Sequence, residues 1–315
     1  MTSSEQSRAG DTVPRSEVRV AAVQMSCSWD LDANLERAEQ LVREAADRDA
    51  QIVLLPELFQ SPYFCCEQNP RYFELAEELA DSRVVARFRR VARELEVVLP
   101  LSFFERAGQA HFNSLAMIDA DGEVLGLYRK SHIPDGPGYQ EKFYFAPGDT
   151  GFRAFRTRYA TVGAGICWDQ WYPESARAMM LLGAEILFYP TAIGSEPADE
   201  SADTRDGWQR AMQGHATSNA VPVVASNRYG QERFDDPSVR PPLFYGSSFI
   251  TDETGAIVEL AEREGDAVLV HAFDRVALRE NRATWGFFRD RRPNLYEPLA
   301  SLTGSPAATG GRQAG

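Results

Sequence analysis

The fold of this chain is limited above all by a repeated alternation of short apolar runs with longer segments whose apolar residues recur at helical spacing. Residues 18–25 (VRVAAVQM), 52–55 and 97–104 have the length and composition of buried strands. Two intervening segments carry an apolar residue every three or four positions: Leu35, Ala38, Leu41, Val42 and Ala45 in the first, and Val84, Phe88, Val91, Ala92 and Leu95 in the second. Strands that alternate with amphipathic helices are typical of layered α/β folds, so this part predicts the order β-α-β-α-β.

The rest of the chain continues the alternation after one predicted hairpin. Asp121-Gly122, between the apolar runs 113–118 and 123–128, is a strong turn signal for an antiparallel pair. Further strands are predicted at residues 161–167, 186–189, 221–226, 245–251, 257–260 and 267–273, and further helices from Pro173 to Gly183 and on the face formed by Trp208, Ala211, Met212, His215 and Ala216. No linker or change in composition divides residues 18–302, which predicts one α/β domain with two layers of sheet between helices.

The two ends of the chain and its overall composition exclude several classes of protein. Residues 1–17 and 303–315 are rich in small and polar residues and predict flexible tails. The formal net charge of −13 argues against a nucleic-acid partner, because phosphate binding needs basic patches. No apolar run approaches the roughly 18 residues of a membrane span, and the N-terminus has no apolar signal region, so we expect a cytoplasmic protein without a membrane partner.

The cysteines and histidines do not form a recognisable metal-binding pattern. The chain has four cysteines, and Cys65 and Cys66 are adjacent but lack a CxxC spacing or a nearby histidine. The four histidines are far apart in the sequence: His111, His132, His215 and His271. Without an HExxH or similar spacing, a zinc hydrolase is not predicted. His215 shares a predicted helix face with Trp208, which is typical of a hydrogen-bonded core residue.

Lysine is almost absent from this chain. Only two of its 33 lysine and arginine residues are lysines, Lys130 and Lys142, and they lie close together. Lysine provides a compact ammonium with three donors, whereas arginine provides a planar fork that stays charged. Where arginine supplies nearly every positive charge, a retained lysine indicates a role that guanidinium cannot fill. The alternative for Lys130 is an ordinary solvated lysine.

Three reactive residues, Glu57, Lys130 and Cys167, each lie at or just beyond the end of a predicted strand. Loops at the carboxyl ends of strands converge around ligands in α/β folds. Each residue has a structural alternative when it is considered alone: a buried cysteine, a buried ion pair or helix cap for the glutamate, and a surface lysine. Together they predict nucleophilic catalysis, in which the carboxylate takes the thiol proton and the ammonium stabilises an oxyanion.

The residues around Cys167 favour this prediction. Gly163 and Gly165 precede the cysteine and allow a tight turn from strand to helix. A thiol on such a turn points away from the strand, and the backbone N–H of the next residue, Trp168, is available to an oxyanion.

Three short segments resemble the signature segments of the carbon-nitrogen hydrolase (nitrilase) superfamily: residues 54–58 (LLPEL), 128–130 (YRK) and 165–169 (GICWD). The similarity extends over about residues 18–299. Longer segments are similar to one branch of the superfamily, the N-carbamoylputrescine amidohydrolases: residues 132–143 (HIPDGPGYQEKF), 189–197 (YPTAIGSEP), 212–216 (MQGHA), 224–228 (VASNR) and 285–293 (WGFFRDRRP).

The resemblance implies a fold, a mechanism and a substrate. It implies a four-layer α-β-β-α sandwich that carries a catalytic triad of Glu57, Lys130 and Cys167, with no metal or organic cofactor. It also implies a homo-oligomer and a second glutamate, Glu141, which positions Lys130 or assists proton transfer. The implied partner is a small cationic ureido substrate, N-carbamoylputrescine, cleaved to putrescine, carbon dioxide and ammonia.

Two alternatives to this function stay open. Another ureido or amide compound, such as N-carbamoyl-β-alanine or an N-carbamoyl amino acid, is a possible substrate within the same superfamily. A catalytically silent binding subunit with the same fold is the other alternative, although all three triad residues are present.

The distal ammonium of N-carbamoylputrescine needs a carboxylate partner and apolar walls around its methylene chain. Glu196 and Asp135 are the candidates for the carboxylate, and Tyr63, Trp168 and Phe145 are the candidates for the walls. The alternative is that the two acidic residues are solvated loop residues and the aromatic residues belong to the core.

Overall fold

A computed structural model describes residues 16–197, 199 and 201–304 of the 315 residues. The predicted flexible tails, residues 1–17 and 303–315, lie almost entirely outside the described residues. The first strand begins at Glu17, one residue before the predicted start of the domain.

One half of the molecule contains six strands: β1 (Glu17–Gln24), β2 (Ile52–Leu54), β3 (Leu99–Ala107), β4 (Ala110–Ile118), β5 (Val124–Arg129) and β14 (Ala267–Asp274). Strand β1 pairs with β14 in the antiparallel sense and with β2 in the parallel sense. Strands β3, β4 and β5 form an antiparallel meander, which a bridge between Ile52 and Val98 connects to β2. The antiparallel pair predicted around Asp121-Gly122 is therefore confirmed as β4 and β5.

The other half contains a six-stranded sheet in the order β13-β12-β9-β8-β7-β6. Its strands are β6 (Ala154–Arg156), β7 (Thr161–Ala164), β8 (Ile186–Pro190), β9 (Val223–Ser226), β12 (Phe249–Thr251) and β13 (Ile257–Leu260). The central strands β7, β8 and β9 run parallel, and helices connect them in sequence. A separate pair, β10 (Tyr229–Gln231) and β11 (Leu243–Tyr245), lies at the end of the molecule.

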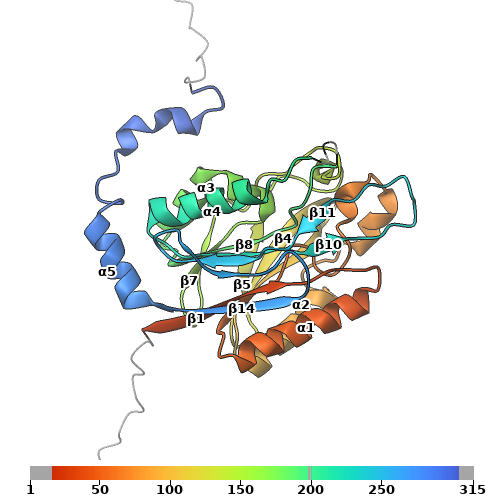
Figure 1. Ribbon diagram of the computed structural model, residues 1–315, viewed down its shortest axis with the longest axis horizontal. Coiled ribbons are helices and arrows are strands. Elements are labelled where there is room, and N and C mark those ends of the chain that lie inside the picture. The colour runs from red at the N-terminus through yellow and green to blue at the C-terminus, as the bar shows by residue number, and fades with distance from the viewer. Residues whose placement is uncertain (1–15, 198, 200, 305–315) are drawn as a thin grey trace, which may run out of the picture.

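Helices cover the outer faces of both sheets (Figure 1). They are α1 (Leu31–Asp47) and α2 (Arg83–Leu95) on one side, and α3 (Pro173–Leu181) and α4 (Arg205–Asn219) on the other. Apolar residues are buried in three layers: between α1, α2 and the first sheet, between the two sheets, and between the second sheet and α3, α4. The predicted four-layer α-β-β-α sandwich is confirmed.

Local signals fix the ends of α1 and α2. The side chain of Asp30 accepts a hydrogen bond from the backbone N–H of Ala33, and that of Ser82 accepts one from Val85, so each helix starts with a side-chain cap. The apolar residues at helical spacing in the sequence are buried in both helices, except for Leu95, which is half-buried. A helix with one apolar stripe is stable only when that stripe is packed, which places both helices on the sheet.

Some predicted elements were wrong in extent. Residues 245–251 were predicted as one strand, but β11 ends at Tyr245 and β12 begins at Phe249. Gly246 and Ser247 between them have φ values of +57° and +52°, a left-handed conformation that interrupts a strand. Strand β7 ends at Ala164 rather than at residue 167, so Cys167 lies on the turn that follows the strand.

The C-terminal part of the described chain leaves the sandwich. Helix α5 (Arg275–Trp285) and the residues after it extend along one end of the molecule and beyond it (Figure 1). Trp285 and Leu299 are 62% and 66% exposed in this segment. Across the residues described, we find no helix with the length and apolar character needed to cross a membrane.

Candidate active site

The three residues predicted from strand ends lie on converging loops. Glu57 follows β2, Lys130 follows β5 directly, and Cys167 begins the short 3₁₀ helix η4 (Cys167–Trp171) after β7. Because β2 and β5 belong to one half of the sandwich and β7 to the six-stranded sheet of the other half, the site is assembled between the two halves. Glu141, on the loop after β5, joins this group through Lys130.

Lys130 is the centre of a fully buried charge cluster. Its Nζ donates hydrogen bonds to Glu57 Oε1 at 2.8 Å and to Glu141 Oε1 and Oε2 at 2.8 and 2.7 Å. Burial alone would lower the pKa of Lys130, but the carboxylates of Glu141 and Glu57 outweigh it and hold this pKa well above its usual value. Burial raises the pKa of Glu141 to about 7, against the opposing effect of Lys130. Lys130 is therefore an ammonium ion at neutral pH.

The carboxylate of Glu57 has one occupied and one unoccupied oxygen. Its Oε1 accepts hydrogen bonds from Lys130 Nζ and from Asn113 Nδ2, the latter at 2.6 Å. Its Oε2 is buried and has no hydrogen-bond partner among the described residues. A buried carboxylate oxygen without a donor is a good proton acceptor, because accepting a proton removes the cost of its isolation. Asn113 donates to Oε1 and not to Oε2. The sequence did not predict Asn113 as a site residue.

Cys167 adopts the left-handed backbone conformation expected of a nucleophile on a sharp turn, with φ +41°. A side chain at Gly165 would come within 2.9 Å of the Tyr189 ring, so glycine is required for the chain to pass there. Burial raises the pKa of the Cys167 thiol well above its usual value, and the negative charge of Glu57 adds to this while Lys130 opposes it. The thiol is thus protonated at neutral pH, so a nucleophilic reaction of its sulfur would require a base.

Asp169 connects the segment that carries Lys130 to the turn that carries Cys167. Its Oδ2 accepts hydrogen bonds from the Tyr128 hydroxyl at 2.7 Å and from the backbone N–H of Ile166 at 2.9 Å. Its Oδ1 accepts the backbone N–H of His132 at 3.0 Å and lies 2.7 Å from His132 Nδ1. Asp169 is fully buried, so one carboxylate fixes the spacing of the two loops.

We expect Asp169→Asn to lower the free energy of unfolding by about 3 kcal/mol. Each carboxylate oxygen of Asp169 faces two hydrogen-bonding groups, and in asparagine an NH₂ group replaces one of these oxygens and faces donors instead. Hydrogen bonds to a charged group contribute about 1.5–3 kcal/mol each. Denaturant unfolding measures this loss. The matched control is Asp252→Asn, since Asp252 accepts three hydrogen bonds in an exposed turn where asparagine is tolerated. Equal small losses in both variants would contradict the role of Asp169.

The site opens into a cavity of about 440 Å³. Cys167 lies at this cavity together with Glu141, and the described residues that line it are Pro134, Asp135, Gly136, Pro137, Tyr139, Glu141, Cys167, Trp168, Gln170, Trp171, Ala192, Ile193, Glu196 and Thr204. The charged side chains in this set are all acidic. Such a lining of aromatic and aliphatic walls with a few polar groups is typical of a small-molecule site.

The structure separates the residues predicted to bind substrate into two groups. Trp168, Glu196 and Asp135 line the cavity as expected, and Trp168 is 38% exposed. Tyr63 and Phe145 are buried and are not among the described lining residues, which corrects their predicted place in the channel wall. The Tyr63 hydroxyl instead donates to Glu141 Oε1 at 2.6 Å, because the aromatic residues around it pack into a separate cluster of the core.

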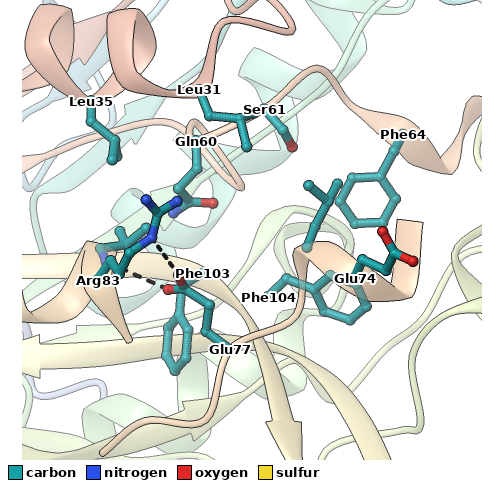
Figure 2. A pocket seen from close by; sticks show the side chains of 12 residues that line it. Leu31, Leu35, Gln60, Ser61, Phe64, Glu74, Glu77, Arg83, Phe103 and Phe104 are labelled. Carbon is teal, nitrogen blue, oxygen red and sulfur yellow. Dashed lines mark hydrogen bonds and ion pairs between the residues drawn. The ribbon is translucent and has the colours of Figure 1, made fainter. Parts of the chain in front are cut away.

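A second, smaller cavity of about 90 Å³ is lined in part by the loop that follows Glu57 (Figure 2). Gln60, Ser61 and Phe64 of that loop line it, and Glu77 and Arg83 form an ion pair of 3.7 Å across it. None of the described residues in its lining is a predicted site residue. This cavity therefore lies beside the loop that carries Glu57, and it is separate from the cavity at Cys167.

The remaining candidates from the sequence lie elsewhere. His215 is buried, and its Nε2 donates to the carbonyl of Gln170 at 2.7 Å, as predicted for a core residue. Cys65 and Cys66 are free buried thiols. Lys142 is exposed on the short helix η3 (Glu141–Phe143), next to Glu141, which is buried.

Comparison with known proteins places most of the chain in one family. A model of the carbon-nitrogen hydrolase family matches residues 19–283. The chain is 56% identical to an N-carbamoylputrescine amidase of Oryza sativa, over 94% of this chain and 99% of that protein. It is 53% identical to a citrullinase of Francisella tularensis, over 90% of this chain and 98% of that protein.

A solved structure supports the same assignment. The carbon-nitrogen hydrolase of Helicobacter pylori superposes with a TM-score of 0.85 at 36% identity, over 91% of this chain and 99% of that one. The fold, the family model and the relatives agree, and this chain belongs to the carbon-nitrogen hydrolase family of amidohydrolases.

Proposed function

We propose that this protein is a cysteine-dependent amidohydrolase that cleaves N-carbamoylputrescine to putrescine, carbon dioxide and ammonia, a reaction of polyamine synthesis from agmatine. The observation that carries the choice of substrate is the charge of the cavity: its described charged residues, Asp135, Glu141 and Glu196, are all acidic. N-carbamoylputrescine ends in an ammonium group, which such a cavity attracts. The 56% identity to the rice N-carbamoylputrescine amidase supports the same choice.

The first half of the proposed reaction forms a covalent intermediate. The Cys167 sulfur attacks the ureido carbon while its proton moves to Glu57, whose Oε2 is the unoccupied acceptor. Lys130 and the backbone N–H of Trp168 stabilise the tetrahedral oxyanion, the latter from the first turn of η4, where backbone donors lack helical acceptors. Glu57 then returns the proton to the terminal nitrogen, and the carbon-nitrogen bond breaks to release ammonia and leave a thiocarbamoyl group on Cys167.

The second half restores the enzyme. Glu57 takes a proton from a water molecule, which attacks the thiocarbamoyl carbon. Collapse of this second tetrahedral species breaks the carbon-sulfur bond, and the proton returns to the Cys167 sulfur. The released carbamate decays to carbon dioxide and putrescine. Glu141, which accepts two hydrogen bonds from Lys130, holds the ammonium toward Glu57 throughout.

Citrulline and N-carbamoyl-β-alanine are the compounds to compare with N-carbamoylputrescine as substrates. At the end opposite the ureido group, both carry a carboxylate, whereas N-carbamoylputrescine carries only an ammonium. A carboxylate has no basic partner among the described lining residues of the cavity. Ammonia release from the three compounds, at equal concentration, tests the proposal. We expect N-carbamoylputrescine to be turned over fastest; faster turnover of either carboxylate compound would overturn the choice of substrate.

Glu196 is the proposed partner of the distal ammonium, since it lines the cavity and is half-buried. We expect Glu196→Gln to raise KM for N-carbamoylputrescine about 10- to 100-fold, because hydrogen bonds to charged groups contribute about 1.5–3 kcal/mol. N-butylurea has the same reacting group without the ammonium, and its kcat/KM in the two proteins is the matched control. An equal loss for both compounds would exclude Glu196 as the partner of the ammonium.

We also propose that the protein is a homo-oligomer. The end of α5 and the segment after it expose Trp285, Leu295 and Leu299, and apolar side chains of this size are normally covered. Light scattering of the full chain measures its mass in solution, and a monomeric mass at micromolar concentration would exclude this proposal. A cytoplasmic location stays a prediction from composition.

A further inference from the structure

The loop from Glu57 to Tyr63 is held by one buried arginine. Arg228, two residues after β9, is fully buried, and its Nη2 donates to the backbone carbonyls of Glu57 and Leu58 at 2.6 and 3.1 Å. Its Nη1 donates to the carbonyl of Ser61 at 3.3 Å. One guanidinium thus binds three carbonyl groups of the loop that presents the proposed base.

Glu232 completes this anchor. It is an ion-pair partner of Arg228, and its other oxygen accepts the backbone N–H of Tyr63 at 2.6 Å. The side chain of Tyr63 in turn donates to Glu141 Oε1. The ion pair therefore holds both ends of the loop and, through it, the two carboxylates that flank Lys130.

Other hydrogen bonds also hold this loop, since the backbone N–H of Leu58 donates to Ser102 Oγ at 3.1 Å and the carbonyl of Gln60 accepts from Asn34 Nδ2 at 2.9 Å, but the carbonyl of Glu57 itself is bound by Arg228. Strand β2, from which the loop emerges, has only three residues, and Gln60, Ser61 and Phe64 line a cavity of about 90 Å³ beside the loop (Figure 2). Leu58 has a φ of +48°, a conformation that a non-glycine residue adopts only when its surroundings impose it.

The energetics of the Arg228–Glu232 ion pair indicate that it does more than stabilise the fold. Burial of two charges is costly, and apolar residues of similar volume often stabilise a fold as well or better. Arg228 Nε has no hydrogen-bond partner among the described residues, which adds to this cost. A cation that contacts three carbonyl groups of one loop is suited to setting the position of that loop.

We infer that the Arg228–Glu232 ion pair positions Glu57 for proton transfer with Cys167. This inference rests on the proposed function, in which Glu57 is the general base. Arg228 does not touch the substrate; it acts through the backbone of Glu57. Small displacements of a catalytic group cost about 10²-fold in rate.

The test compares Arg228→Met and Arg228→Lys with the wild type, using N-carbamoylputrescine. The concentration of competent sites is measured by alkylating Cys167 and counting the modified peptide by mass spectrometry, so that kcat refers to sites rather than to total protein. We expect kcat per site to fall about 100-fold in Arg228→Met, with KM changed less than about threefold, because the base and not the substrate cavity is displaced. Arg228→Lys should recover part of the loss, since an ammonium still pairs with Glu232 but reaches fewer carbonyl groups.

The control is Arg275→Met, which removes a partly buried ion pair, Arg275–Glu185 at 2.8 Å, away from the site. It should lose stability in thermal unfolding and keep its kcat per site. If Arg228→Met fails to fold, Arg228→Lys carries the test. Full kcat per site in the folded Arg228 variants, or a loss confined to KM, would overturn the inference.

The variant Glu57→Gln separates the positioning role of Arg228 from the proposed role of Glu57 as the base. If Glu57→Gln keeps normal turnover, the proposed base is wrong. If Glu57→Gln is inactive while the Arg228 variants are normal, only the positioning role is refuted.

Discussion

Cys167→Ala should lose essentially all turnover of N-carbamoylputrescine, with kcat at least about 10⁴-fold below that of the wild type. The expected loss is this large because alanine cannot form the thiocarbamoyl intermediate, and the described lining of the cavity contains no other thiol. Continuous measurement of ammonia release determines it. Thermal unfolding of the same variant should stay close to that of the wild type, because only one sulfur atom is removed.

Cys27→Ala is the control for this prediction. Cys27 is also a buried free cysteine, but it lies outside the cavity, where its sulfur contacts the backbone carbonyl of Phe59. Most of the wild-type kcat should remain in this variant. Ammonia release by Cys167→Ala at a rate near that of the control would show that catalysis does not depend on this thiol.

Lys130→Arg should keep the positive charge and still lose turnover about 10³-fold. Lys130 is fully buried, with three carboxylate oxygens within 2.8 Å of its Nζ, and this space fits an ammonium. A guanidinium is larger and planar, so it displaces Glu57 or Glu141 and withdraws its donors from the oxyanion. Loss of one oxyanion donor alone costs about 10²–10³-fold in kcat.

Lys142→Arg is the matched control, because it makes the same substitution at the only other lysine of the chain, which is exposed. Its kcat should stay within about twofold of the wild type, since surface substitutions have small effects. Thermal unfolding of Lys130→Arg distinguishes lost chemistry from lost structure. A folded Lys130→Arg with near-normal kcat would disprove the role assigned to the ammonium.

The architecture and the central cluster could be predicted because their signals are local. Alternating apolar runs and amphipathic segments specify the layers, and the ends of strands indicate where loops converge. Glu57, Lys130 and Cys167 each lie within three residues of the end of a strand, so a correct strand assignment places all three near one another. The scarcity of lysine directed attention to Lys130, and the structure shows why a point charge is needed among three oxygens.

The supporting residues could not be predicted in the same way, because their partners are distant in the sequence. Asn113 contacts Glu57 across 56 positions, and Arg228 contacts the Glu57 carbonyl across 171. The local sequence does not distinguish a polar residue that orients a base from a polar residue that faces solvent. The break between β11 and β12 was missed for a related reason: Ser247 is held in a left-handed conformation by tertiary contacts, including a backbone hydrogen bond to Glu262.

The most direct test of this mechanism is mass spectrometry of the wild-type protein quenched during turnover of N-carbamoylputrescine. We predict a carbamoylputrescine-derived adduct, equal to the substrate less ammonia, on the peptide that contains Cys167, together with a burst of ammonia equivalent to the number of modified sites. Sustained release of ammonia with Cys167 unmodified at every quench time, under conditions in which hydrolysis of the adduct limits the rate, would contradict covalent catalysis by this residue.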